Sequence, residues 1–161
     1  MKALFLSSIM LFLTVGFLSA NTDNNEIIDN ANLSVELVNK VFEDAYYEII
    51  EVNANENYLL VKDIWKVYVD IDNDKNYITF SLTWSTNEEA SLEDKLALVN
   101  MISTKVLMVA PYVSTSSGNI VIKYDLWVEG GVSKKNVILS HKAFVKSLHL
   151  ILELDTELIL N

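Results

Sequence analysis

Three aspartates occupy alternate positions in the stretch DIDNDKN: Asp70, Asp72 and Asp74. Carboxylates at the first, third and fifth positions of a loop are how an EF-hand calcium site begins. Such a loop also needs glycine at its sixth position and glutamate at its twelfth, where this chain has Lys75 and Ser81. Asp and Asn are equally typical of hairpin turns, because they tolerate turn conformations and accept hydrogen bonds from the nearby backbone. We therefore predict a hairpin corner, with a weak calcium contact as the alternative.

The only two histidines of the sequence, His141 and His149, both fall on the last expected helix. At 100° per residue their side chains point about 80° apart and lie about 12 Å apart along the helix axis. A metal ion therefore cannot bridge them unaided. His141 interrupts an apolar stripe, so we interpret it as a core histidine with a hydrogen-bond partner or as part of a helix-lined interface, rather than as a general acid or base.

Other reactive groups have no catalytic context in this sequence. The chain has no cysteine, which excludes thiol catalysis, disulfides and cysteine-bound zinc. No serine lies in the G-x-S-x-G context of a nucleophile elbow. Gly130 and Gly131 lack the further glycine and lysine of a phosphate-binding loop. We therefore predict no enzymatic activity, no cofactor and no dedicated metal site.

The charge of the chain argues against nucleic acid as a partner. The net charge of the 161 residues is −10, and all 12 basic residues are lysines. Recognition of phosphates and guanines relies on the planar fork of arginine, which this chain lacks. Acidic proteins are also repelled by nucleic acid and by anionic membrane surfaces.

Residues 1–20 have the three-part pattern of a secretory signal peptide. Lys2 supplies the positive charge, the run Ala3–Leu18 is almost wholly apolar, and Ala20 is a small residue at the cut point. Cleavage would remove Lys2 and no acid, which changes the net charge from −10 to −11. We predict a periplasmic or secreted protein cleaved after Ala20, with an uncleaved N-terminal anchor as the alternative. The polar residues 21–32 are expected to be flexible.

Hydrophobic periodicity predicts one α+β domain over residues 33–161. The expected elements are a helix opened by Ser34, strands at 46–53, 57–63, 64–71 and 77–84, a helix at 91–104, strands at 105–113 and 119–127, and a helix opened by Ser133. Because the strands arrive in adjacent runs, we expect a mostly antiparallel sheet of about five or six strands packed with three helices, in the order α-β-β-β(-β)-α-β-β-α.

Apolar stripes predict which helical residues face the core. In the helix at 91–104, opened by a capping box of Ser91 and Asp94, the inward residues are expected to be Leu92, Leu96, Val99 and Ile102. In the last helix they are expected to be Val137, His141, Phe144, Leu148 and Ile151. Residues 153–161 are expected to extend this last helix.

Three segments resemble the YbjN family of bacterial proteins. They are NIVIKYDLWVEGGVSKKNVILSHKAFVKSLHLILE (residues 119–153), WKVYVDIDNDKNYITFSLTW (residues 65–84) and SLEDKLALVNMIST (residues 91–104). The resemblance extends over residues 33–153 and consists of apolar patterns and turns. It implies a fold similar to that of type III secretion chaperones, a homodimer, and binding to an extended segment of a client protein. The family is labelled as a regulator of sensory transduction and supplies no catalytic residues.

Aromatic and charged residues on the strands are the candidates for an interaction surface. Lys123, Asp125 and Trp127 share one face of the strand at 119–127, and we add His141 as the fourth candidate residue. We therefore predict an exported, non-enzymatic interaction module that forms a homodimer and binds another polypeptide through a sheet face or edge. The alternative is a periplasmic domain that binds a small ligand or acts as a sensor.

Overall fold

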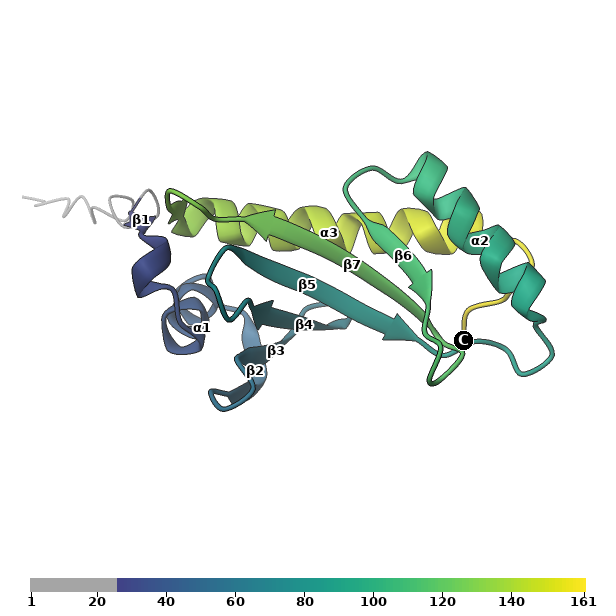
Figure 1. Ribbon diagram of the computed structural model, residues 1–161, viewed down its shortest axis with the longest axis horizontal. Helices are drawn as coiled ribbons and strands as arrows, with labels where there is room; N and C mark the ends of the chain where they lie inside the picture. Colours follow the sequence, from purple (N-terminus) through teal and green to yellow (C-terminus); the bar gives the residue numbers. More distant parts are fainter. Residues whose placement is uncertain (1–25) are drawn as a thin grey trace, which may run out of the picture.

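The computed structural model describes residues 26–161, so the signal peptide predicted for residues 1–20 lies outside the described part of the chain. Within residues 26–161 the chain forms three α-helices, a short 3-10 helix and eight β-strands (Figure 1). In chain order they are β1 (Ile27–Ile28), η2 (Asn30–Asn32), α1 (Val35–Asp44), β2 (Glu48–Asn53), β3 (Tyr58–Lys62), β4 (Lys66–Ile71), β5 (Tyr77–Trp84), α2 (Leu92–Lys105), β6 (Ala110–Val113), β7 (Ile120–Trp127), β8 (Val132–Ser133) and α3 (Lys134–Leu154). The predicted α+β class is confirmed.

Six strands form one antiparallel sheet in the order β2-β3-β4-β5-β7-β6. Hairpins place β2 to β5 side by side, α2 then leads to the edge strand β6, and β7 returns between β6 and β5. The strands β5 and β7 pair from Tyr77 opposite Trp127 to Trp84 opposite Ile120. Because successive side chains of a strand point to opposite faces, this register decides which residues lie together.

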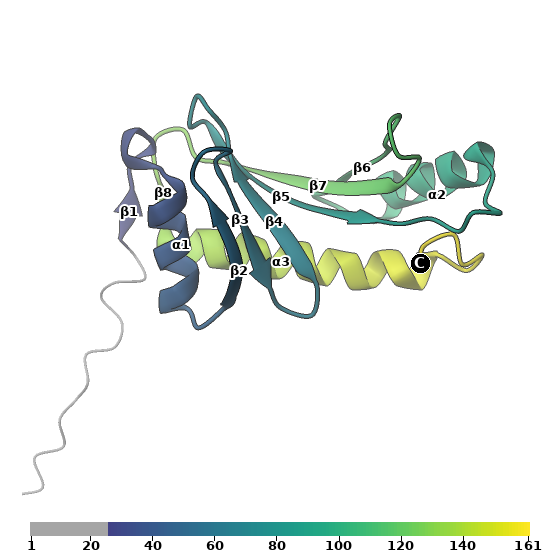
Figure 2. The same ribbon diagram turned by 90° about the horizontal axis from the view of Figure 1, so that it is seen from below.

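The helices α1 and α3 cover one face of the six-stranded sheet, which we call the inner face, whereas α2 lies beside the edge strand β6 (Figure 2). Buried inner-face residues of the central strands include Val67, Val69, Ile78, Phe80, Ile120 and Ile122. The stripe predicted for the last helix is buried as expected: Val137, His141, Phe144, Leu148 and Ile151. Each large apolar side chain that is fully buried contributes about 1.5–3 kcal/mol to folding. None of the helices in the described part combines the length and the apolar character needed to cross a membrane.

The three predicted helix starts are confirmed. The hydroxyl oxygens of Ser34 and Ser133 accept hydrogen bonds from backbone N–H groups in the first turns of α1 and α3. At the start of α2, Ser91 Oγ accepts from the N–H of Asp94 at 3.2 Å, and Asp94 Oδ2 accepts from the N–H of Ser91 at 2.9 Å. This reciprocal pair is the predicted capping box, which satisfies two backbone donors that the helix leaves free.

The region between α2 and β7 differs from the prediction of a strand at 105–113. The helix continues to Lys105, and only Ala110–Val113 forms the strand β6. The N–H of Val106 still donates to the carbonyl of Ile102 at 2.8 Å, so the helical hydrogen bonds extend past the expected end. Met108 then adopts a positive φ of 72°, which reverses the chain where a strand was expected.

The buried stripe of α2 is also different from the prediction. Val99 and Ile102 are buried as expected, but Leu92 and Leu96 are 62% and 46% exposed, and Leu98 is buried in their place. Because α2 lies beside a sheet edge and not across a face, only a narrow side of the helix meets the core (Figure 1). Sequence periodicity cannot reveal this lateral position.

Residues 153–161 do not extend the last helix. α3 ends at Leu154, and the carboxylate of Asp155 accepts hydrogen bonds from the N–H groups of Ile159 and Leu160 at 2.9 and 2.8 Å. These bonds fold the chain back so that Leu160 pairs with Thr86. The buried Asp155 side chain thus accepts hydrogen bonds from two backbone N–H groups, which in a continuing helix would donate to backbone carbonyls instead.

The segment 26–32, predicted to be flexible, packs beside the start of α3. Ile27 and Ile28 of β1 pair with Ser133 and Val132 of β8, and Ile28 is buried. This approach requires glycine at position 131, where φ is +97° and a Cβ atom would lie 2.8 Å from Cγ2 of Ile27. Residues 27–32 thus form a strand and a turn of 3-10 helix in the segment that was expected to be flexible.

Candidate functional site

The face of the six-stranded sheet opposite α1 and α3, which we call the outer face, carries charged and hydroxyl side chains of the strands together with several aromatic rings. No helix covers it within residues 26–161 (Figure 2). One row across β3, β4, β5 and β7 consists of Tyr58, Asp70, Thr79 and Asp125. The neighbouring row consists of Leu60, Tyr68, Ser81 and Lys123.

Asp125 is the centre of a polar cluster on the outer face. Its Oδ1 accepts a hydrogen bond from Thr79 Oγ1 at 2.6 Å, and its Oδ2 lies 3.2 Å from Nζ of Lys123. The same ammonium group lies 5.8 Å from the centre of the Tyr77 ring, which stacks on Trp127 with 6.3 Å between centroids. The structure therefore brings Lys123, Asp125 and Trp127 together, as the strand alternation predicted. Their use as an interaction surface stays a prediction.

Exposed aromatic rings flank this cluster. Trp127 is 61% exposed although its ring stacks on Tyr77. Tyr68, on the neighbouring strand β4, is also exposed and packs edge-to-face against Tyr58 at 5.6 Å. The hydroxyl of Tyr58 donates to Glu51 Oε1 at 2.6 Å. These contacts fix the orientation of large rings that solvent can still reach.

Asp70 is the unusual charged group of this face. It is only partly exposed, and its carboxylate makes no hydrogen bond or ion pair within residues 26–161. Burial raises the pKa of Asp70 above its usual value, while the positive charge of Lys123 acts in the opposite direction. An acid in this position favours a nearby cation or a proton.

The corner between β4 and β5 is a hairpin turn, as predicted. Asp72 Oδ2 accepts from the N–H of Asn76 at 3.3 Å, and the carbonyl of Asp72 accepts from the N–H of Lys75 at 2.9 Å. Lys75 has a positive φ of 59°, the conformation that glycine adopts most easily. The three aspartates do not converge, and the described residues contain no group of acids or histidines placed to hold a metal ion.

His141 lies on the opposite side of the sheet from the other three predicted residues. Its ring is fully buried among Phe42, Tyr47 and Phe80, with centroid distances of 5.2, 4.9 and 6.0 Å. Burial lowers its pKa to about 4, against the opposing charge of Asp63. Neither ring nitrogen has a hydrogen-bond partner within residues 26–161, so the prediction of such a partner was wrong. His141 is a core residue and cannot contribute directly to the outer face.

The edge strand β2 is a second candidate for contact with a polypeptide. At one edge, β6 contains Pro111, which has no N–H to donate, and α2 packs against this strand. At the other edge, β2 presents Ile50 and Val52, which are 41% and 44% exposed. A bulge between Ile49 and Glu51 interrupts its pairing with β3. As the outermost strand on this side of the sheet, β2 pairs only with β3 within residues 26–161, and α1 packs against it.

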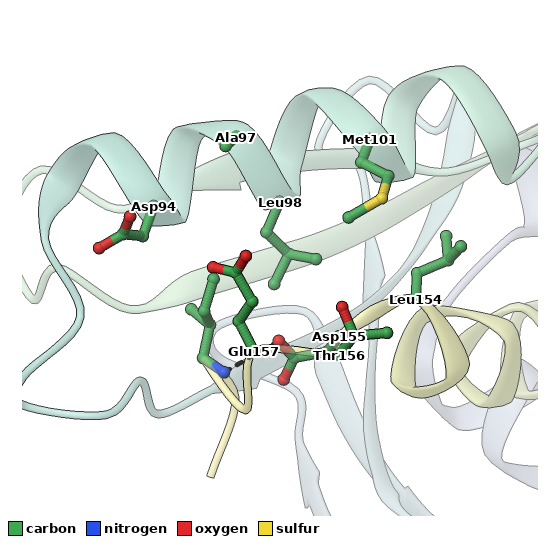
Figure 3. Close-up of a pocket in the computed structure, with 9 residues that line it drawn as sticks. Asp94, Ala97, Leu98, Met101, Leu154, Asp155, Thr156 and Glu157 are labelled. Carbon is green, nitrogen blue, oxygen red and sulfur yellow. Dashed lines mark hydrogen bonds between the residues drawn. The ribbon is translucent and has the colours of Figure 1, made fainter.

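A cleft separates α2 from residues 155–161, the segment that follows α3 (Figure 3). Its volume is about 300 Å³, within the size range of small-ligand pockets. The residues that line it are Asp94, Ala97, Leu98, Met101, Leu154, Asp155, Thr156, Glu157 and Ile159. The sequence predictions did not include this cleft, because it depends on the turn at Asp155.

Known proteins are similar to this chain in fold. No family model matches the sequence, and no curated protein matches it. The crystal structure of YbjN from E. coli, a protein proposed to regulate transcription, matches with a TM-score of 0.67 and 17% identity over 80% of this chain and 96% of YbjN. An uncharacterised protein from Methanothermobacter thermautotrophicus matches with a TM-score of 0.58 and 14% identity over 78% of this chain and 99% of that protein. The chain therefore has the fold of YbjN, which confirms the resemblance at the level of structure.

Proposed function

We propose that this protein is an exported, non-enzymatic interaction module that forms a homodimer and binds another polypeptide through the outer face or the β2 edge. The observation that carries this proposal is the open outer face, where Trp127 is exposed and stacked beside the Lys123–Asp125 pair. Exposed Trp and Tyr residues are the side chains that most often dominate binding between proteins.

The contacts within the outer face favour binding because they orient its side chains in advance. Trp127 is held by Tyr77, and Asp125 by Thr79 and Lys123. Side chains that are already ordered lose less conformational entropy when a partner arrives. A polypeptide lying across β5 and β7 would meet rings for its apolar groups and one cation and one anion for its polar groups.

Export and dimerisation rest on other grounds. Export is supported by the signal-like residues 1–20, and dimerisation by the resemblance to the YbjN family. The relation to YbjN is one of fold, and the net charge of −10 with no arginine argues against direct contact with DNA. We therefore propose a polypeptide, and not a nucleic acid, as the partner.

The proposal is tested on residues 21–161 by light scattering combined with capture from a periplasmic extract. We expect a dimer that retains a specific protein, and we expect Trp127→Ala to weaken capture about tenfold or more. Tyr46→Ala is the matched control, because Tyr46 is 97% exposed but lies in the turn between α1 and β2. A monomer that retains nothing would contradict the proposal, and equal capture by both variants would exclude the outer face as the binding surface.

A sensory domain that binds a small ligand is the second candidate, and the cleft of about 300 Å³ beside α2 favours it. A ligand that binds only the folded protein raises its thermal stability by mass action. The check is a thermal-unfolding screen against a panel of metabolites. A panel without any shift in unfolding temperature would count against this candidate.

A further inference from the structure

The cleft beside α2 continues along the helix into a second hollow. That hollow has a volume of about 230 Å³ and shares Asp94, Glu157 and Ile159 with the first. Its other walls come from the loop before α2, at Asn87 and Glu89. We call the two together the α2 groove. It lies between the N-terminal half of α2 and the segment 155–161, away from the outer face of the sheet.

The floor of the α2 groove is apolar. Leu98 and Met101 point from α2 toward the segment 155–161, and Leu154 points toward the same space from the end of α3 (Figure 3). Ile159 completes this floor and is buried. The walls therefore suit an aliphatic chain, which would lose contact with water on entering.

The rim of the groove is acidic, and none of its lining residues is a lysine. Asp155 already accepts two backbone hydrogen bonds and is not available to a ligand. Asp94 uses Oδ2 for the capping box, which lowers its pKa and keeps it charged at neutral pH. Its Oδ1 accepts no hydrogen bond from residues 26–161, and neither does the carboxylate of Glu157, which rises toward α2 (Figure 3).

We propose that the α2 groove binds small aliphatic amines. The ammonium group would lie between Asp94 and Glu157, and the methylene chain would cover Leu98 and Met101. Charge complementarity selects the cation, because the lining of the groove within residues 26–161 contains acids and no lysine. The apolar floor selects an ion with an aliphatic stem over a compact, fully hydrated ion.

The test is an NMR titration of residues 21–161 at low salt with hexylammonium as the probe. We expect saturable shifts of the backbone amides of Ala97, Met101 and Thr156. Two related probes distinguish the contribution of the charge from that of the aliphatic chain. Hexanoate has an aliphatic chain with the opposite charge, and tetramethylammonium has the positive charge without a long aliphatic chain. We expect both to bind at least about tenfold more weakly than hexylammonium, and we expect added salt to weaken the binding of hexylammonium.

Three variants locate the site. Glu157→Gln and Asp94→Asn should each weaken the binding of hexylammonium about two- to fivefold, the usual range for a solvent-accessible ion pair. Ala97→Phe should weaken the binding of hexylammonium without any change of charge, because the added ring would occupy the groove. Glu93→Gln is the matched control, since Glu93 is an exposed acid on α2 that does not line the groove.

The proposal would be overturned if hexanoate bound as well as hexylammonium, or if Glu93→Gln weakened binding as much as Glu157→Gln. Binding of a lysine-containing peptide without binding of the free amine would also overturn it, and would assign the groove to a polypeptide. The inference does not depend on the outer face. Trp127→Ala should therefore leave amine binding unchanged, whatever its effect on capture of a partner.

Discussion

The two faces of the six-stranded sheet accommodate buried polar side chains in different ways. On the inner face, His141 is fully buried without a hydrogen-bond partner in residues 26–161, and burial lowers its pKa to about 4. On the outer face, Thr79 is nearly as buried, but its hydroxyl donates to Asp125 at 2.6 Å. The inner face buries a titratable group without a partner, whereas the outer face pairs the buried hydroxyl of Thr79 with a carboxylate.

This difference separates a face that stabilises the fold from a face whose polar groups stay accessible to water. An unpaired polar group is tolerated in the core only in its uncharged form, because charging it there costs several kcal/mol. Paired groups such as Asp125 and Lys123 stay half-exposed, so they can still exchange partners. Substitutions on the inner face should therefore affect folding, and substitutions on the outer face should mainly affect recognition.

The largest expected difference is between two neighbours in β5, Thr79 and Phe80. Phe80→Ala removes a fully buried ring from the centre of the inner face and should lower the free energy of unfolding by about 3–5 kcal/mol. Thr79→Ala on the outer face should cost only about 1 kcal/mol, the value of one hydrogen bond. Urea unfolding followed by circular dichroism measures both. Equal losses for the two variants would remove the distinction between the faces.

The second prediction concerns the pH dependence that His141 gives to the inner face. The pKa of His141 is about 4 in the folded chain and 6.5 as its ordinary value. Between these pH values the unfolded chain binds a proton that the folded chain excludes, so the free energy of unfolding should fall as pH drops from 6.5 to 4. The total loss should be about 3 kcal/mol.

The check is urea unfolding at a series of pH values with two variants. His141→Phe should lose this slope, because its ring cannot take up a proton. His149→Gln should keep it, because His149 is an exposed residue of the same helix and lies outside the buried cluster around His141. A slope that survives His141→Phe would show that another group is responsible.

The third prediction tests whether pairing stabilises the outer face. Thr79→Val and Asp125→Ala should each lower the free energy of unfolding. The double variant should lower it by less than the sum of the two single effects. The coupling free energy from this double-mutant cycle should be about 1 kcal/mol. Urea unfolding at neutral pH measures the change in the free energy of unfolding for the two single variants and the double variant. Strictly additive losses would mean that the 2.6 Å hydrogen bond contributes nothing to stability.

The inner face was largely predictable from the sequence, because periodicity alone places its residues. The stripe of α3, including His141, and the alternation of β7 both follow from the spacing of apolar residues. The helix starts at Ser34, Ser91 and Ser133 were predictable for a similar reason, since capping needs only local chemistry.

The outer-face cluster was predictable only in part, because it depends on register between strands distant in the sequence. The alternation of β7 placed Lys123, Asp125 and Trp127 on one face, but only the pairing of β5 with β7 brings Thr79 to Asp125 and Tyr77 to Trp127. The α2 groove was not predictable at all. It needs the sideways position of α2 and the reversal at Asp155, both of which are set by tertiary contacts.

The smallest expected effect belongs to Asp70, an outer-face residue that behaves partly like His141. Its carboxylate is half-buried without a partner in residues 26–161, and burial raises its pKa above the usual 3.8. The folded chain therefore binds a proton more readily than the unfolded chain, and the wild type should lose stability as pH rises from 3.8 through the folded pKa. Asp70→Asn should remove this loss and be more stable at pH 7 by less than about 1 kcal/mol.

Lys123→Met sharpens this prediction, because it removes the positive charge that holds the pKa of Asp70 down. In that variant the carboxyl carbon of Asp70, followed by NMR, should titrate at higher pH than in the wild type. The gain from Asp70→Asn should also be larger in the Lys123→Met background, since the half-buried charge then has no nearby cation. If Asp70→Asn instead lowered stability at pH 7, the carboxylate would have a stabilising partner, and the outer face would pair all of its polar groups.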